Sequence, residues 1–371
     1  MSTIDEILAL LKQGGKYSVQ QTLDGGMNGY AFRATHIPLF TQVFLKVCDA
    51  DPDSKALFQE PQSLIAATKS SASKNLIKLV DADKLGADFI LMATEWADGG
   101  DLLQQIQKVI GQADAVRIAI DILHGVTVLH SARLVHRDIK PANVLLCREG
   151  ETDIPKVGDF GSAAAIPEGS SSVSASRHSA LYVPTEGWET PSSYGIPSDL
   201  YQIGIILDEM VNGALPYDLA SYLDRTAAQE MKASSISNLD ELGDYERSKL
   251  IDSSISRRCS SRKILSMRPA RPYQSKSLKR IINKSIAPLA SQRFQTSTAF
   301  ISSLQSLDIP NWRPADEDFE ALQWRGWDWR VAGSSSNYVV YRRRSKTAAY
   351  RRWGSPYASL VSAFFAVEPF R

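Results

Sequence analysis

The residues best suited to chemistry lie together between Leu134 and Leu146, in the run Leu-Val-His-Arg-Asp-Ile-Lys-Pro-Ala-Asn-Val-Leu-Leu. Asp138 can accept a proton from a hydroxyl, Lys140 can contact a phosphate, and the amide oxygen of Asn143 is a ligand that Mg²⁺ accepts. Phosphoryl transfer requires these functions, namely positioning, a metal ion and neutralisation of charge. The alternative interpretation is a plain polar turn between two buried strands.

A second carboxylate follows in Lys156-Val-Gly-Asp-Phe-Gly161, where Asp159 stands between a predicted strand and a flexible glycine and can turn toward a metal. In order and spacing, the two stretches resemble the H-R-D-x-x-x-x-N loop and the D-F-G motif of the eukaryotic-type protein kinase family. A lysine two residues after Asp138 is the serine/threonine version of the pattern. The resemblance implies an α+β fold with a small β-rich N-lobe and a helical C-lobe.

The resemblance also implies a role for each matching residue. Asp138 would be the catalytic base and Lys140 would neutralise charge on the γ-phosphate, while Asn143 and Asp159 would hold Mg²⁺ or Mn²⁺. Lys46, in the strand-like run Val43 to Val47, would contact the α- and β-phosphates of ATP and pair with Glu60. The residues with supporting structural roles would be His136, Arg137, Glu186, Asp199 and Arg293, with Glu186 and Arg293 forming a buried ion pair.

The same resemblance implies an ATP site. Its residues would be Leu23, Gly26, Gly29, Ala31, Phe44, Lys46, the gatekeeper Thr94, the hinge residues Glu95 and Ala97, and Asp101 near the ribose. The chain departs from the family pattern at Asp24, where a glycine is usual, and at Phe44, where the family has alanine. Because Ala31 stands where the family usually has valine, we interpret Phe44 and Ala31 as a volume-conserving exchange.

The segment from Ser162 to Ser179 is rich in small residues and serine and has no apolar periodicity, so it is predicted to be a mobile loop. Its position corresponds to the activation segment of the family. The charge of Arg137 favours a nearby anion, and a phosphoserine would supply one. The predicted phosphorylation sites are Ser170, Ser171, Ser172, Ser174 and Ser176, whereas Ser179 would contact the catalytic Asp and Lys. A simple flexible linker is the alternative.

The elements that must position these groups follow from periodicity. Apolar residues at helical spacing predict a short helix over the first 14 residues, and alternation predicts strands at Tyr17–Leu23, Val43–Val47, Leu76–Val80 and Phe89–Met92. Ala113–Ser131 is predicted to be a helix with one buried stripe. We therefore divide the chain into an N-terminal helix (1–15), a kinase-like domain (16–307, with lobes 16–94 and 98–307) and a C-terminal module (308–371).

Composition narrows the class of protein. The 371 residues are 43% hydrophobic and 22% charged with a formal net charge of +1, which is ordinary for a globular protein and argues against a general polyanion binder. Three widely separated cysteines fit a reducing compartment. The N-terminus carries acids rather than the bases of a signal peptide, and no apolar run approaches a membrane span. We expect a cytoplasmic protein.

Two regions carry an unusual composition. Residues 253–307 contain no Asp or Glu, and Arg257 to Lys284 form a basic stretch that could attract an acidic protein or a nucleic acid, or could be a solvated insertion. The C-terminal module combines Trp312, Trp324, Trp327, Trp329 and Trp353 with arginines, a combination that suits single-stranded nucleic acid or a protein partner. A small module that buries its own tryptophans is the alternative. A hairpin is predicted across residues 328–343, and a final helix is predicted from Ser355-Pro356.

The sequence therefore predicts an ATP-dependent serine/threonine protein kinase that acts on protein substrates. Three alternatives stay open: a pseudokinase scaffold, a protein whose C-terminal module does the main work through nucleic-acid or protein binding, and a small-molecule kinase of related fold. Lys140, Pro141 and the segment Tyr182 to Glu186 favour protein substrates over small molecules.

Overall fold

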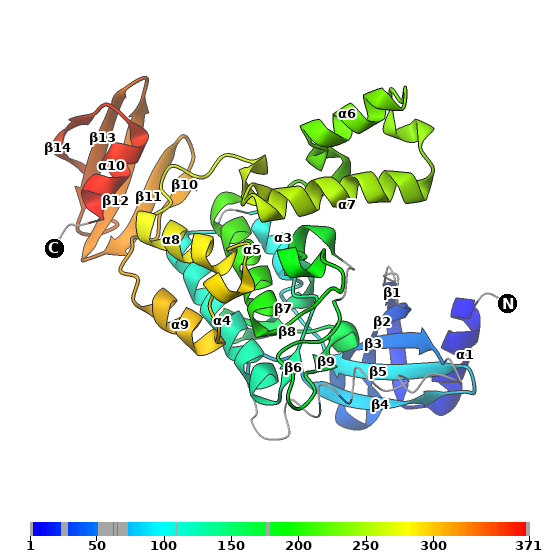
Figure 1. Cartoon of the computed structure of the whole chain (residues 1–371). Helices are drawn as coiled ribbons and strands as arrows, with labels where there is room; N and C mark the ends of the chain where they lie inside the picture. The colour runs from blue at the N-terminus through cyan, green and yellow to red at the C-terminus, as the bar shows by residue number, and fades with distance from the viewer. Residues whose placement is uncertain are drawn as a thin grey trace. The chain divides into compact units, whose positions relative to one another are not determined.

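The computed structural model describes residues 3–23, 29–50, 62, 65, 73–108, 110–175 and 179–368. The chain divides into two compact units. One unit consists of Met1–Leu102, His124–Arg137 and Ala142–Ser170, and the other of Leu103–Leu123, Asp138–Pro141 and Ser171–Arg371. Figure 1 labels the helices and strands of both units.

A five-stranded antiparallel sheet dominates the first unit, with strands in the order β1-β2-β3-β5-β4. The strands are β1 (Tyr17–Leu23), β2 (Tyr30–His36), β3 (Thr41–Asp49), β4 (Leu79–Leu85) and β5 (Phe89–Glu95). Helix α1 (Thr3–Gly14) contributes the buried Ile7 and Leu11 to one core with Val43, Leu45 and Val47 of β3. Because successive side chains of a strand alternate between faces, Phe44 and Lys46 belong to the opposite face.

The remainder of the first unit holds the motif loops between short strands. Strand β6 (Leu134–Val135) pairs with β9 (Ala164–Ala165), and β7 (Val144–Glu149) pairs with β8 (Thr152–Val157). Short 3-10 turns at Pro141–Asn143 and Phe160–Ser162 lie beside these strands in the chain. The tight hairpin of β7 and β8 therefore joins the stretch that ends at Asn143 to the stretch that contains Asp159.

The second unit is mainly helical. Helix α5 (Ile196–Asn212) is buried along almost its whole length, and its Gly204 lies so close to α8 (Lys276–Ser285) that a Cβ there would approach Ser285 Oγ to 2.1 Å. The other helices are α3 (Leu102–Ile106) and α4 (Gln112–Ser131), whose ranges begin at or cross the boundary between the units, and α6 (Arg225–Ala233), α7 (Asp244–Ser260) and α9 (Ser297–Gln305). This architecture confirms the predicted α+β class with a β-rich and a helical part.

The C-terminal residues build a second five-stranded antiparallel sheet in the order β10 to β14. Its strands are β10 (Arg313–Ala315), β11 (Asp318–Trp324), β12 (Trp327–Ser334), β13 (Asn337–Arg343) and β14 (Arg351–Tyr357), followed by α10 (Leu360–Val367). Trp312, Trp329 and Phe364 are fully buried between the sheet and α10, in a core that also includes Tyr273. Two tryptophans are therefore part of the buried core of this module, and Trp324, Trp327 and Trp353 pack against it while partly exposed.

Polar contacts join this module to the helical part of the same unit. The Asn311 side-chain oxygen accepts from the backbone N–H groups of Ala113 (3.0 Å) and Asp114 (3.2 Å), so it caps the first turn of α4. The Asn311 amide donates to Asp114 Oδ2 (2.7 Å), and the buried Gln112 amide donates to the Pro310 carbonyl (2.8 Å). The module is therefore bound to the α4 N-terminus by specific side chains.

Two local predictions were wrong. The final helix does not begin at Ser355-Pro356, because those residues extend β14, and Ser359 instead caps α10 by accepting from the Ser362 N–H (3.1 Å). A proline can occupy an edge strand, since its missing N–H costs no ladder hydrogen bond there. The strand predicted at Leu76–Val80 lies three residues later, at Leu79–Leu85.

Much of the basic stretch 257–284 is engaged within the protein. Arg257 pairs with Asp224 at the start of α6 (2.6 Å), Arg258 donates to the Tyr222 carbonyl (3.0 Å), and Arg268 pairs with the buried Asp208 (2.8 Å). These contacts support the interpretation that this stretch is largely structural. The exposed cations Lys276, Lys279, Arg280 and Lys284 lie along one side of α8.

Candidate active site

The first unit brings together a lysine and a carboxylate that lie far apart in the chain. Lys46 of β3 contacts Asp159 with 2.9 Å between Nζ and Oδ1. Asp159 has φ 58° and ψ 74°, a left-handed conformation that a non-glycine residue rarely adopts. The strained backbone at this position points to a functional constraint.

Packing and hydrogen bonds hold the strained backbone at Asp159 in place. Phe160 is buried and its ring lies 5.3 Å from the ring of the fully buried His136, whose Nε2 lies 3.0 Å from the Gly158 carbonyl oxygen. The Gly158 N–H donates to the Asn143 carbonyl (2.9 Å). These contacts connect the stretch around His136 directly to the stretch around Asp159, so the two motifs are packed as one element.

Asn143 and Asp159 fit a magnesium site. The buried Asn143 offers an amide oxygen, and Asp159, with a side chain 37% exposed, offers carboxylate oxygens. Among the described residues there is no group of three or more His, Cys, Asp or Glu side chains that could hold a metal. Mg²⁺ is usually bound by one or two protein oxygens together with substrate phosphates rather than by a protein cage, so this donor set suits it.

The second unit holds the predicted base. The Asp138 side chain is 8% exposed, and its Oδ2 lies 2.9 Å from Lys140 Nζ. Lys140 Nζ also donates to Ser179 Oγ (3.0 Å), so a cation and two oxygen groups of the predicted catalytic set are in mutual contact. The Ile139 N–H donates to Gln202 Oε1 of α5 (2.9 Å), which fixes the backbone immediately after Asp138.

Gln202 was not singled out from the sequence. Asp199, the residue expected to anchor the loop, lies fully buried on α5, one helical turn before Gln202. The available sequence signal was a polar residue three positions after Asp199 in the same predicted helix, because two side chains at this spacing share a helix face.

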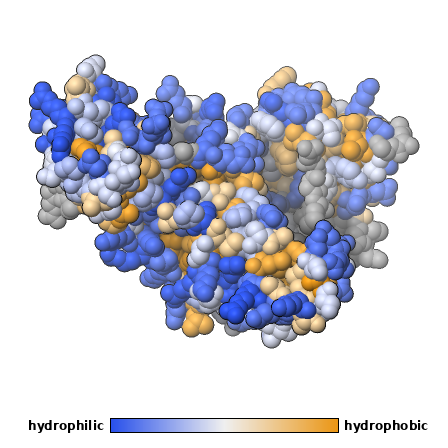
Figure 2. Space-filling view, turned by 90° about the horizontal axis from the view of Figure 1, so that it is seen from above, coloured by the Kyte–Doolittle hydropathy of each residue, from blue (hydrophilic) through white to orange (hydrophobic). Residues whose placement is uncertain are grey.

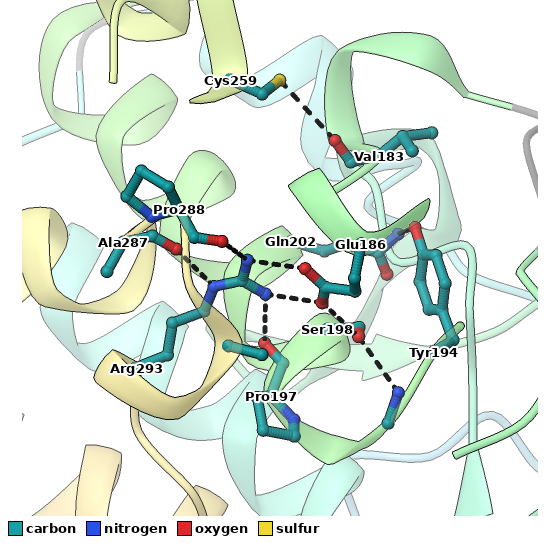
Figure 3. A network of polar contacts seen from close by, with 12 residues as sticks. Val183, Glu186, Tyr194, Pro197, Ser198, Gln202, Cys259, Ala287, Pro288 and Arg293 are labelled. Carbon is teal, nitrogen blue, oxygen red and sulfur yellow. Dashed lines mark hydrogen bonds and ion pairs between the residues drawn. The ribbon is translucent and has the colours of Figure 1, made fainter. Parts of the chain in front are cut away.

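An ion pair between the buried Arg293 and the partly buried Glu186 lies at the end of the segment that contains Ser179 (Figure 3). Arg293 donates from Nη1 and Nη2 to the two carboxylate oxygens of Glu186, each at 2.7 Å. Its remaining donor atom, Nε, bonds the Ala287 carbonyl (2.6 Å), and Ser198 Oγ donates to Glu186 Oε1 (2.7 Å). Every part of the pair is therefore hydrogen-bonded, which is the condition under which a buried charge pair is tolerated.

A fully buried carboxylate, Glu209, holds the neighbouring tyrosine. The fully buried Glu209 of α5 accepts from the Tyr182 hydroxyl (2.7 Å), the Tyr217 hydroxyl (3.1 Å) and the Leu215 N–H (2.9 Å). Burial raises the pKa of Glu209 above its ordinary value, although these three donors act to lower it. Like Gln202, Glu209 was not singled out from the sequence.

We expect Glu209 to make stability fall as pH rises. With a raised pKa the folded state binds the proton more tightly than the unfolded chain, so the free energy of unfolding declines above the ordinary Glu value of 4.5, by up to about 1.4 kcal/mol per pH unit. The measurement is urea unfolding of wild type and Glu209→Gln between roughly pH 5 and pH 8. The free energy of unfolding should decline less with rising pH in the variant than in the wild type. The same pH dependence of the unfolding free energy in both proteins would contradict the assignment of this effect to Glu209. Burial also raises the pKa of Asp208, but Asp208 is present in both proteins, so its contribution cancels in the comparison.

The nucleotide residues predicted from the sequence are described only in part. Glu60, Gly26 and Ser176 lie outside the described residues, as does Asp24. In the sheet, Ala31 pairs with Lys46 and Phe44 pairs with Thr94, so all four belong to one face. Leu23 ends β1, Gly29 precedes β2, and Ala97 and Asp101 follow β5.

The hinge after Thr94 is held by ion pairing. Both carboxylate oxygens of Glu95 lie 2.9 Å from Lys156 Nζ, and Glu95 Oε1 also accepts from the Lys78 N–H (2.8 Å). The Glu95 backbone N–H donates to the Lys78 carbonyl (3.0 Å). Of this residue's backbone groups, the carbonyl oxygen is therefore the one that could contact adenine.

Truncating Phe44 should weaken ATP binding. Phe44 is half-buried on the face that carries Lys46, and its loss would leave a space that Ala31 cannot fill. We expect Phe44→Ala to raise the KM for ATP about tenfold, the lower end of what a lost apolar contact in a pocket costs. The matched control is Phe40→Ala, because Phe40 is 89% exposed in the turn between β2 and β3. An unchanged KM in Phe44→Ala would refute the exchange of volume with Ala31.

Comparison with known proteins gives one family and several relatives. Residues 17–303 match the family model described as the protein kinase domain. The chain is 30% identical over 222 residues to serine/threonine-protein kinase atg1 of Dictyostelium discoideum, a match that covers 58% of this chain and 33% of the relative. It is 30% identical over 215 residues to serine/threonine-protein kinase pkn3 of Myxococcus xanthus, covering 55% of this chain and 39% of the relative.

A third relative is serine/threonine-protein kinase ATG1c of Arabidopsis thaliana, 29% identical over 207 residues, with 55% of this chain and 28% of the relative covered. The chain thus spans well under half the length of these three relatives. None of the helices in the described part of the chain is long and apolar enough to cross a membrane.

Proposed function

The chain belongs to the protein kinase family, and we propose that it transfers the γ-phosphate of ATP to serine and threonine hydroxyls of proteins. The observation that carries this proposal is the contact of Lys140 with both Asp138 and Ser179. It holds the base at a fixed position beside the segment that ends at the buried Glu186–Arg293 pair. The serine/threonine-protein kinases to which the chain is similar support the same assignment.

The side chains would divide the reaction among them. Asp138 would accept a hydrogen bond from the substrate hydroxyl, orient it, and take its proton as the new O–P bond forms. Lys140 would neutralise charge on the transferred phosphate, and Lys46 would hold the α- and β-phosphates. Lys46 and Lys140 are each held by a carboxylate 2.9 Å away, so catalysis would come mainly from positioning and preorganised charge.

Asn143 and Asp159 would hold Mg²⁺, which when bound neutralises charge on the ATP phosphates. Lys46 lies against Asp159 at 2.9 Å, so the residue that would contact phosphate and the residue that would hold the metal are already adjacent. A protein that had lost nucleotide chemistry would not need this charged pair on a half-exposed face.

The proposal is tested by phosphate transfer to a mixed protein substrate such as casein. With labelled ATP and Mg²⁺, the full chain should give acid-stable phosphoserine and phosphothreonine, and excess chelator should abolish the label. Label on tyrosine alone, or label on a small metabolite with none on protein, would contradict a serine/threonine protein kinase.

We also propose that the chain phosphorylates its own activation segment. The side-chain donor Nη2 of Arg133 bonds the carbonyl oxygens of Pro167 (2.8 Å) and Ser170 (3.1 Å), which places a cation next to an exposed serine. Ser171 and Ser174 are also exposed. A phosphate added here would gain a charge-assisted hydrogen bond.

Mass spectrometry after incubation with MgATP should therefore find phosphate on one or more of Ser170, Ser171, Ser172, Ser174 and Ser176. The Asp138→Asn protein, incubated alone, is the control and should stay unmodified. Wild-type protein that phosphorylates casein while this segment remains free of phosphate would rule out autophosphorylation without affecting the kinase assignment.

A pseudokinase scaffold is the second candidate, motivated by three departures from the family pattern: Asp24, Phe44, and Thr185, which stands where the family has the proline of its A-P-E motif. The contacts of Lys46 and Lys140 with carboxylates favour the active enzyme. Nucleotide binding without any transfer, in wild type and Asp138→Asn alike, would establish the scaffold instead.

A further inference from the structure

The hairpin of β13 and β14 in the C-terminal module is unusually basic. Six cations lie between residues 342 and 352, and there is no acid from residue 329 to residue 367, although the whole chain has a formal net charge of only +1. The cations are Arg342, Arg343, Arg344, Lys346, Arg351 and Arg352. The charge is therefore local and is not a reflection of overall composition.

One of these cations, Arg343, stabilises the fold of the hairpin. Arg343 donates to Asp328 Oδ2 (3.2 Å) and to the Lys346 carbonyl (3.1 Å), and its guanidinium lies 4.4 Å from the centre of the Tyr350 ring. Because Asp328 is fully buried, this ion pair anchors the turn to β12. Arg343 therefore holds the loop between the strands in one shape. Arg352 also contacts the backbone of the hairpin, because its Nε donates to the Gly354 carbonyl (3.3 Å).

The register of the strands concentrates charge. Arg342 lies directly opposite Arg351, and Tyr341 lies opposite Arg352. Like charges opposite each other destabilise a sheet unless an anion or another contact offsets them. No Asp or Glu of this hairpin can do so, because the hairpin contains none.

Aromatic rings hold two of the guanidinium groups in place. Arg342 lies 4.1 Å and Arg344 lies 4.9 Å from the centre of the half-buried Trp327 ring. Stacking of a guanidinium on a ring uses its flat face, so the N–H groups at its edge can still donate to an oxyanion. The arginines are therefore positioned in advance for a ligand that carries several oxyanions.

We propose that this hairpin surface, formed by Arg342, Arg344, Lys346, Arg351 and Arg352 with Tyr341 and Trp327, binds single-stranded nucleic acid. Arginine forks match phosphate oxygens, and a base could stack on the half-buried Tyr341 ring. Figure 2 shows that hydrophilic side chains predominate toward the left end of the view, where Figure 1 has the C-terminal module. Arg344, Lys346, Arg351 and Arg352 are exposed. An acidic protein would satisfy the charges but would have no use for the rings.

The test measures binding of the full chain to a labelled oligothymidylate of about 16 nucleotides by fluorescence anisotropy, a length at the upper end of known single-strand sites. Affinity should fall as salt rises, with a slope of roughly −0.7 for each phosphate contacted. Arg351→Glu/Arg352→Glu should bind about tenfold more weakly or worse, and its salt slope should be smaller by roughly 1.4.

The matched control is Lys279→Glu/Arg280→Glu, which reverses the same number of charges on the exposed side of α8. It should bind like wild type, and both variants should keep the wild-type unfolding temperature and casein phosphorylation. Equal losses in the two variants, or unimpaired binding by Arg351→Glu/Arg352→Glu, would overturn the assignment to this hairpin. Equal competition by polyglutamate or by a duplex would overturn the assignment to a single strand. Loss of binding with kinase activity intact would separate this surface from the catalytic proposal.

Discussion

Replacing Arg293 by methionine should lower the free energy of unfolding by about 3–5 kcal/mol, the cost of leaving a buried charge without its partner. Arg293 has a side chain with 0% exposure and donates two hydrogen bonds of 2.7 Å to the carboxylate of Glu186. Methionine fills similar space and removes the charge. Glu186 would then have only Ser198 among these side-chain donors, so the carboxylate would be both poorly solvated and poorly paired.

Urea unfolding of Arg293→Met against wild type measures the effect, and the double variant Glu186→Gln/Arg293→Met is the control. The double variant has no charge at the positions of this pair, so it should recover part of the lost stability. Solvent-exposed ion pairs contribute no more than about 1 kcal/mol. If the unfolding free energy of Arg293→Met lies within about 1 kcal/mol of the wild-type value, the pair does not stabilise the fold as its geometry indicates.

Replacing Asp138 by asparagine should reduce kcat by about 10²-fold to 10⁴-fold, the contribution expected of a general base in proton transfer. The asparagine amide can still contact Lys140, but it cannot take a proton from a hydroxyl. The KM for ATP should change little, since the proposed phosphate ligand is Lys46. Steady-state kinetics with casein and varied ATP would separate the two parameters.

Asp153→Asn is the matched control for Asp138→Asn. Asp153 lies on β8 in a partly exposed pair with Arg148 (3.4 Å) and has no role in the proposed reaction. It should keep wild-type kcat. A loss of activity as large in Asp153→Asn as in Asp138→Asn would mean that removal of any carboxylate harms the fold, and the base would then be unassigned.

The part of the site that could be predicted from the sequence consists of short motifs, whose residues lie close together because they are close in the chain. Asp138 and Lys140 are two residues apart, and their contact follows from a tight loop. The pairing of Lys46 with Asp159 spans 113 positions, yet the family resemblance of each motif was enough to expect both residues in one nucleotide site. Strand alternation gave the face of Lys46 without reference to its partner.

The part of the structure that was not predicted depends on how the helices are oriented and on which distant segments contact them. The hydrogen bond from Ile139 to Gln202 spans 63 positions and depends on the rotation of α5 about its axis, which periodicity in an almost fully buried helix does not determine. The cap that Asn311 supplies to α4 comes from a separate segment, so no local cap signal marks it. The final helix was misplaced because Ser355-Pro356 carries a valid local start signal, while tertiary pairing extends β14 through it.

The central claim is that Asp138 and its contacts make this chain a serine/threonine protein kinase. The most direct measurement compares wild type and Asp138→Asn, at equal concentration with labelled ATP, Mg²⁺ and casein, followed by analysis of the phosphorylated amino acids. We predict phosphoserine and phosphothreonine from wild type and almost none from Asp138→Asn, with both proteins binding ATP alike. Equal label from the two proteins, or none from a wild-type protein that binds ATP, would contradict the claim.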